Sequence, residues 1–223
     1  MKRWGLLVLT VVLGIAFVGL VGALFSWASP QSRLPVAQAE VRGTVDTPKG
    51  VMPHAFLEMS SWADSMAGGC HGDDGGAEPD WVTFCPTTNF ELPANALVTI
   101  TVKQYDGGEK ITNPFFARVH GTVDGSATLN GEAFTQIDPE KVGHTFTMHS
   151  ISGEGQDSLF VSVPLELSEE ENVTPNVIEF SFYTGAAGTF YWNCEFPCGD
   201  GTLANFGGPM ATQGYMAGTI MVV

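Results

Sequence analysis

Hydrophobic positions along the chain follow two different patterns. From Trp4 to Trp27 the sequence is almost unbroken Leu, Val, Ile, Gly, Ala and Phe, whereas beyond residue 80 short apolar runs alternate with polar residues between turn residues. An apolar run of about 23 residues is long enough to cross a hydrocarbon core of ~30 Å as a helix. Short alternating runs bounded by Gly, Asp, Asn and Pro predict an all-β sandwich or barrel. The pattern therefore predicts an N-terminal transmembrane helix followed by one β-rich domain.

Two basic residues set the expected orientation of that helix. Lys2 and Arg3 precede the apolar run and predict a cytoplasmic N-terminus, with the rest of the chain outside the cell membrane. A cleaved signal peptide is the alternative, because Ala37-Gln38-Ala39 has the small-x-small form of a cleavage site. Signal peptides carry apolar runs of only ~7–15 residues, so we favour an uncleaved, single-pass anchor with the domain on the extracytoplasmic side.

The clearest strand patterns lie beyond residue 80. Residues 97–105 alternate and end at Asp106-Gly107-Gly108, and residues 177–183 place apolar side chains on one face and mostly polar ones on the other. The other predicted strands are 81–84, 115–119, 126–129, 144–149, 159–163, 190–192 and 219–223. A count of 27 glycines with only 15% charged residues also favours a β-rich fold with many turns.

Composition shifts suggest four segments. Residues 1–28 form the anchor, residues 29–50 read as a linker without an apolar period, residues 51–88 extend the domain at its N-terminal side, and residues 89–223 form the β domain. Within the extension the type of element is ambiguous. Six apolar residues could line one side of a short helix, namely Phe56, Leu57, Met59, Trp62, Ala63 and Met66.

Net charge excludes one class of function. The formal net charge is −15, which argues against binding nucleic acid because that function needs a basic face. An acidic surface permits docking to a basic partner, although solubility is its simpler explanation.

Sulfur-bearing residues gather near the C-terminus. Cys194 and Cys198 lie four residues apart, and Met210 and Met216 follow, all between the predicted strands 190–192 and 219–223. Thiolate and thioether sulfurs are soft ligands that copper accepts, and a loop between two rigid strands can bring several of them to one point. The sequence therefore predicts a copper site in this loop.

This segment resembles the cupredoxins, and in particular the copper-binding domain of cytochrome c oxidase subunit II. Cys194-Glu-Phe-Pro-Cys198-Gly199 matches the family's Cys-x-x-x-Cys-Gly, Met216-Ala-Gly-Thr219 matches its Met-x-Gly-Thr, and His144 stands before Thr-Phe as the upstream ligand does. The resemblance covers roughly residues 89–223. It implies a cupredoxin-like Greek-key β-sandwich in a membrane-anchored bacterial or archaeal protein, with copper as cofactor.

The resemblance also implies the ligands. His144, Cys194, Cys198 and Met216 would hold the metal, and the backbone carbonyl of Glu195 would face it. The chain departs from the family at one position: the second ligand histidine lies three residues before the methionine, where this chain has Gln213.

Two residues compete with the expected ligands. Met210 is either an extra ligand that replaces the lost histidine or a packing residue in a Gly-Gly-Pro turn. His149 competes with His144, but strand alternation places the two on opposite faces, and only His144 has the family pattern.

Four cysteines allow three pairings. If Cys194 and Cys198 bind metal, Cys70 and Cys85 remain to form a disulfide across a Gly-rich loop. The alternative is a Cys194–Cys198 disulfide in a sandwich that binds no metal.

Three functions follow from these alternatives. The first is a copper protein that exchanges electrons with a respiratory electron-transfer protein or an oxidase subunit. The second is a copper chaperone or store, because one imidazole with several sulfurs favours Cu(I). The third is a metal-free accessory module. In each case we expect a carrier or binding protein, at most one subunit of an oxidase complex, rather than an enzyme in its own right.

Overall fold

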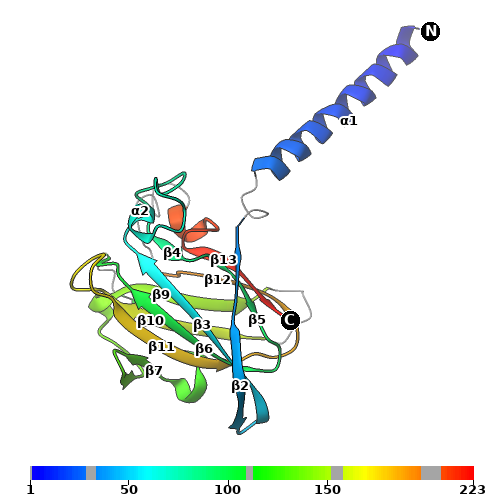
Figure 1. Ribbon diagram of the computed structural model, residues 1–223. Helices are drawn as coiled ribbons and strands as arrows, with labels where there is room; N and C mark the ends of the chain where they lie inside the picture. The colour runs from blue at the N-terminus through cyan, green and yellow to red at the C-terminus, as the bar shows by residue number, and fades with distance from the viewer. Residues whose placement is uncertain (1, 29–33, 109–112, 152–157, 197–206) are drawn as a thin grey trace. The chain divides into compact units, whose positions relative to one another are not determined.

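The computed structural model describes residues 2–28, 34–108, 113–151, 158–196 and 207–223. The chain divides into a helical unit, Met1–Leu34, and a compact unit, Pro35–Val223. In the first unit a single helix, α1 (Lys2–Ala28), follows from the uninterrupted apolar sequence (Figure 1). Searched over the described residues alone, the chain has no helix that is both long and apolar enough to cross a membrane.

Two β-sheets make up the compact unit (Figure 1). The first sheet has the strand order β1 (Val36–Gln38), β5 (Asn89–Leu92), β13 (Ala217–Val222), β12 (Gly188–Asn193), β9 (Val142–Ser150) and β10 (Phe160–Glu166). The second has the order β2 (Glu40–Thr47), β3 (Gly50–Trp62), β6 (Leu97–Gln104), β11 (Asn176–Tyr183), β7 (Ala127–Leu129) and β8 (Glu132–Phe134), with β4 (Thr83–Cys85) paired to β3. Short helical turns connect them: α2 (Ser65–Gly68), η2 (Val123–Gly125), η3 (Pro139–Lys141) and η4 (Gly208–Ala211). The predicted all-β class is therefore confirmed for the compact unit.

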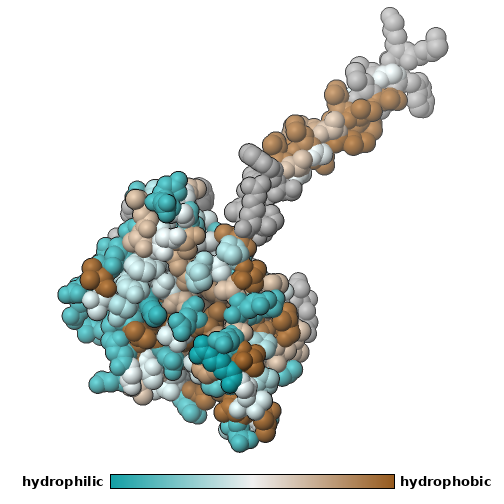
Figure 2. Space-filling view, viewed as in Figure 1, coloured by the Kyte–Doolittle hydropathy of each residue, from teal (hydrophilic) through white to brown (hydrophobic). Residues whose placement is uncertain are grey.

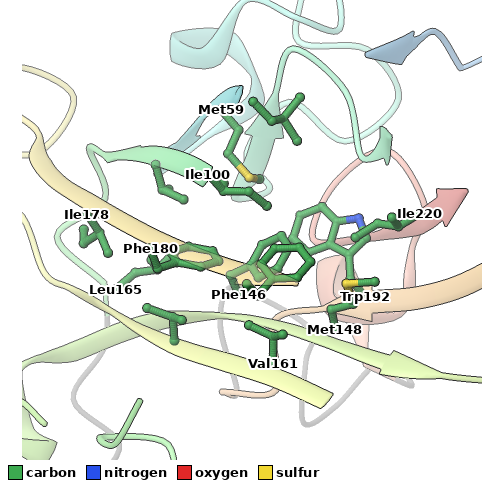
Figure 3. Packing of buried hydrophobic residues seen from close by; sticks show 14 of the residues in the cluster. Met59, Ile100, Phe146, Met148, Val161, Leu165, Ile178, Phe180, Trp192 and Ile220 are labelled. Carbon is green, nitrogen blue, oxygen red and sulfur yellow. The ribbon is translucent and has the colours of Figure 1, made fainter. Parts of the chain in front are cut away.

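The core fills the space between the two sheets and is rich in aromatic rings (Figure 3). Trp192 of β12 stacks on Phe146 of β9 with 4.9 Å between ring centroids. Phe146 also meets Phe180 of β11 at 5.3 Å, so the two sheets are in direct contact. Burial of such large apolar side chains is the main favourable term in folding.

Alternation along β11 shows why the sequence could predict this strand. Ile178, Phe180 and Phe182 are buried and face the core, whereas Glu179 is exposed. A period of two between buried and exposed positions is what a half-buried strand requires. The predicted inward face of residues 177–183 is confirmed.

The helix considered for residues 51–67 is wrong. Most of this segment is β3, and only Ser65–Gly68 is helical. Ala55, Leu57 and Met59 are buried at alternate positions, because β3 pairs in parallel with β6 along its length. The sequence of this segment fits both a helical and a strand period, and pairing with neighbouring strands determines that it forms a strand.

The predicted linker over residues 29–50 also differs from the structure. Residues 36–38 and 40–47 form β1 and β2, which pair with β5 and β3 respectively. The compact unit begins at Pro35, so it contains residues 51–88, which were predicted to extend the domain, as well as residues 89–223. One predicted strand, 115–119, is instead a turn followed by isolated bridges at Arg118 and His120.

Candidate metal centre

An imidazole and a cysteine sulfur meet at one end of the core. His144 lies on β9, and Cys194 directly follows β12, which pairs with β9. His144 Nδ1 and Cys194 Sγ are 3.8 Å apart, and both residues are almost fully buried. Metal bonds of about 2.0 Å to nitrogen and 2.3 Å to sulfur place two such donors roughly 3.5–4 Å apart when the angle between them is tetrahedral or wider. The two predicted ligands therefore fit a common metal.

Polar groups surround the cysteine sulfur. The backbone N–H of Thr145 points at Cys194 Sγ over 3.4 Å, and the carbonyl oxygen of Phe196 lies 3.2 Å from the same sulfur. The hydroxyl of Thr145 accepts a hydrogen bond from the backbone N–H of Glu195 at 2.9 Å. The N–H of Thr145 would stabilise negative charge on the sulfur of a metal-bound cysteine, whereas the carbonyl of Phe196 accepts from the thiol in the metal-free chain.

A buried carboxylate orients the imidazole. Asp106, which follows β6, hydrogen-bonds His144 Nε2 through Oδ2, while its Oδ1 accepts from the backbone N–H of Gly108 at 2.8 Å. Because Nε2 is engaged with the carboxylate, Nδ1 is the nitrogen that faces Cys194. From the sequence alone, Asp106 was expected only to begin a turn. Its role depends on its contact with His144, which lies 38 positions away in the sequence.

Electrostatics within this pair are strong. Burial by itself would lower the pKa of His144, but the charge and hydrogen bond of Asp106, with a smaller effect of Cys194, outweigh burial and raise that pKa to about 10. Burial would likewise raise the pKa of Asp106, yet the opposing effects of His144 and the Gly108 amide lower it below its ordinary value. The copper-free pair is therefore an ion pair at neutral pH.

The backbone of Met216 is hydrogen-bonded to that of Cys194. Met216 is fully buried, its carbonyl oxygen accepts from the N–H of Cys194 at 3.0 Å, and its own N–H donates to the carbonyl of Pro209 at 3.0 Å. The structure thus places His144, Cys194 and Met216 on three adjacent strands or their ends, with Met216 joined to Cys194 through the backbone.

The glycine of the Met-x-Gly-Thr motif has a structural explanation. A Cβ on Gly218 would overlap the carbonyl group of Thr88. The same carbonyl accepts a hydrogen bond of 2.7 Å from the indole N–H of Trp192. Only glycine allows β13 to approach the Thr88 backbone this closely.

Other predicted site residues are placed as follows. Cys198 lies outside the described residues, and Glu195 is described through its backbone N–H alone at this site. Met210 lies in η4 and packs, partly buried, against the core. His149 lies beside the ring of Tyr191, with centroids 5.6 Å apart.

Gln213 occupies the position where the family has a histidine. Its amide nitrogen donates to the hydroxyl of Thr219 at 3.2 Å. Its amide oxygen is buried and has no hydrogen-bond partner among the described residues. The side chain is thus engaged with β13.

A metal site here would include methionine and cysteine sulfur atoms among its ligands. Within the described ranges, no group of three or more His, Cys, Asp and Glu side chains could hold a metal ion. The expected ligand set adds Met216 and Cys198 to His144 and Cys194, and Cys198 lies outside the described residues. One imidazole with several sulfur donors is a set that suits copper.

Cys70 and Cys85 form a disulfide. This is the pairing expected if Cys194 and Cys198 bind metal.

Several solved structures are similar to this chain at low identity. Auracyanin B is 14% identical, with 83% of this chain and 97% of that chain covered and a TM-score of 0.35. Rusticyanin from Thiobacillus ferrooxidans is 12% identical, with coverages of 82% and 87% and a TM-score of 0.34. A heme-copper terminal oxidase dimer solved by cryo-EM is 13% identical, with 100% of both chains covered and a TM-score of 0.27. No protein-family profile and no curated protein matches the chain.

Proposed function

We propose that this chain is a membrane-anchored, cupredoxin-like copper protein that carries electrons on the extracytoplasmic side of the cell membrane. The observation that supports it best is the approach of His144 Nδ1 to Cys194 Sγ at 3.8 Å in a buried position. The resemblance of residues 194–199 and 216–219 to the copper domain of cytochrome c oxidase subunit II supports the same function. A respiratory electron-transfer protein or an oxidase subunit is the proposed partner.

Copper would be held by His144, Cys194, Cys198 and Met216, and when bound it supplies a one-electron couple. The residues around it have separate tasks. Thr145 directs its N–H at the sulfur, Asp106 holds the imidazole by Nε2, and aromatic rings such as Phe84, 6.4 Å from the His144 ring, exclude water. A dry, preorganised donor set is what fast electron transfer needs.

Rigid strands support this proposal. His144 pairs with Leu165 of β10 beside a register shift in that ladder, and Cys194 and Met216 border the ladder between β12 and β13. Because all three residues are fixed by strand pairing, the donors would move little when the metal changes oxidation state.

The anchor is proposed from sequence. Trp4 to Trp27 is almost unbroken apolar residues, and Lys2 and Arg3 precede it. The described side chains of α1 are mostly hydrophobic and exposed (Figure 2). The Cys70–Cys85 disulfide supports an oxidising compartment for the compact unit.

Copper delivery or storage is the second candidate, and Gln213 favours it. An amide engaged with Thr219 replaces the second imidazole, so the remaining donors are softer and prefer Cu(I).

Voltammetry of the copper-loaded full chain in detergent distinguishes the two functions. A reversible one-electron wave supports electron transfer. Tight Cu(I) binding without such a wave, together with transfer of the metal to a copper-free oxidase domain, supports delivery. If the chain binds no copper in either oxidation state, both proposals fail.

A further inference from the structure

The residue before Met216 is held by a distant loop. We name residues 70–85, which the Cys70–Cys85 disulfide closes, the disulfide loop. The N–H of Phe84 donates to the carbonyl oxygen of Tyr215 at 2.8 Å, and the N–H of Glu78 donates to the Tyr215 hydroxyl at 3.0 Å. Both ends of Tyr215, its backbone and its hydroxyl, are therefore fixed by this loop.

Aromatic rings of the disulfide loop enclose the Tyr215 ring. His71 stacks on it with 4.5 Å between centroids and an interplanar angle of 10°. Trp81 meets it edge-on at 5.2 Å. As a result Tyr215 is only 7% exposed although it lies in a loop. Stacked and edge-on aromatic contacts of this kind add specific geometry to the burial.

The disulfide loop also hydrogen-bonds Gly214. The hydroxyl of Thr83 donates to the carbonyl of Gly214 at 3.3 Å, while the N–H of Gly214 donates to the hydroxyl of Thr88, outside the disulfide loop, at 2.8 Å. His71 Nε2 lies 2.9 Å from the Thr83 hydroxyl, so the two holding residues are linked to each other. The disulfide loop thus supplies backbone, ring and hydroxyl contacts to Gly214 and Tyr215, in addition to the contacts of their own N–H groups with Thr88 and Thr212.

The disulfide loop is held by its covalent closure, by the pairing of β4 with β3, and by Ser65, which hydrogen-bonds the carbonyls of Glu78, Pro79 and Trp81. Residues 71–82 form turns without a helix or strand, and most of their side chains other than Trp81 and Val82 are small or polar. Gly75 is buried at φ 75°, where a Cβ would come within 2.8 Å of Met66. The covalent closure adds to these contacts, because a disulfide reduces the number of open conformations.

We infer that the disulfide loop is a clamp that positions Met216. Through Gly214 and Tyr215 it sets where the Met216 backbone enters β13, and therefore where the thioether lies relative to Cys194 and His144. Tyr215 is in this sense a positioning residue. The inference rests on the proposed function only for its effect on copper; the clamp itself is a property of the copper-free chain.

Two measurements test the clamp on the full chain in detergent. In the copper-free chain, the ¹³C-methyl NMR signal of Met216 and the amide hydrogen exchange of Tyr215 and Met216 report the position and mobility of the segment. In the copper-loaded chain, the reduction potential and visible spectrum report the thioether. We compare Cys70→Ser/Cys85→Ser, Tyr215→Leu and Tyr215→Phe, with Tyr183→Leu on β11 as the matched control.

The clamp predicts which variants should alter the Met216 segment and which should not. The double cysteine variant and Tyr215→Leu should shift or broaden the Met216 methyl signal, accelerate exchange at Tyr215 and Met216 by about tenfold or more, and shift the potential. Tyr215→Phe keeps the ring contacts and should change these values little, and Tyr183→Leu should leave the Met216 signal unchanged.

An unchanged Met216 signal and potential in folded Tyr215→Leu would overturn the inference and leave the loop with a stabilising role only. If the cysteine variant does not fold, His71→Ala, which removes the stacked ring and keeps the disulfide, must produce the shift. Because the NMR and exchange measurements need no metal, failure to bind copper would refute the proposed function without touching the clamp.

Discussion

At the scale of single residues, the centre depends on what lies behind each ligand. His144 was predicted from its local sequence, but Asp106, the group that fixes its orientation, was not. The two residues meet because β6 delivers Asp106 to the core end where β9 places His144. Local motifs identify ligands, whereas the groups that orient ligands come from strands far apart in sequence.

Asp106→Ala should weaken copper binding. The variant removes the partner of His144 Nε2, and loss of such an orienting group commonly reduces metal affinity about 10–100-fold. Competition with a chromophoric Cu(I) chelator measures the affinity of the full chain. Asp46→Ala, an exposed aspartate on β2, is the matched control. Equal affinities for the two variants would contradict the orienting role.

The pair also predicts how the stability of the copper-free chain depends on pH. The pKa of His144 is raised from 6.5 to about 10, so its contribution is complete below pH 6.5 and is lost as pH rises toward 10. The pKa of Asp106 is lowered from 3.8, so its contribution is present above 3.8 and is lost as pH falls further.

Urea unfolding of the copper-free chain between pH 6 and 10 measures this contribution. We expect the free energy of unfolding to decrease as pH rises from 6.5 to 10, and Asp106→Asn to flatten that part of the curve. A variant curve that runs parallel to the wild-type curve would contradict the ion pair.

Met216→Leu should separate ligation from packing. Leucine has nearly the same volume, so the free energy of unfolding of the copper-free chain should change by less than about 1.5 kcal/mol. Loss of the thioether should shift the reduction potential of the copper-loaded chain. Met210→Leu provides the comparison: loss of metal would make Met210 a ligand, and a small effect would make it a packing residue. An unchanged potential in Met216→Leu would remove Met216 from the ligand set.

At the scale of elements, the strands that carry the site were predictable and those around them were not. β9, β11 and β12 have alternating or aromatic sequences that indicate strands without further context. β2 is exposed at most positions, so its sequence has no hydrophobic period to read. β3 carries spacings that fit either a helix or a strand until β6 pairs with it.

The site, like the strands, has parts that the sequence predicts and parts that it does not. The motif around Cys194 and Met216 is short and local, so the sequence indicated it directly. The clamp on Tyr215 joins residues 131 and 137 positions apart and required the folded structure. Contacts of this range depend on strand register, which the sequence did not specify.

Gly218→Ala tests how tightly β13 is seated. β13 pairs with both β5 and β12, and the added methyl group would overlap the carbonyl of Thr88. We expect the free energy of unfolding to fall by about 1–3 kcal/mol or more, as overpacking of a rigid core commonly costs. Chemical denaturation of the copper-free chain measures it. Unchanged stability would show that β13 can move away from Thr88.

At the scale of the whole molecule, the surface of the compact unit bears on which partner the protein could meet. Polar and apolar residues are interspersed on the face of the compact unit in Figure 2, and the net charge is −15. Such a surface keeps a protein soluble and permits encounter with a basic partner. Tyr215, which stacks on His71 and directly precedes the buried Met216, is 7% exposed, so the disulfide loop covers this part of the chain.

Copper stoichiometry with the visible absorption spectrum of the full chain tests the central claim most directly. The account predicts bound copper with an intense thiolate-to-copper charge-transfer band in the wild type, loss of both in Cys194→Ser, and an almost unchanged spectrum in His149→Ala, because an alcohol is a far weaker copper ligand than a thiolate and His149 lies beside Tyr191 instead. A Cys194→Ser variant that binds copper with the wild-type spectrum would contradict it.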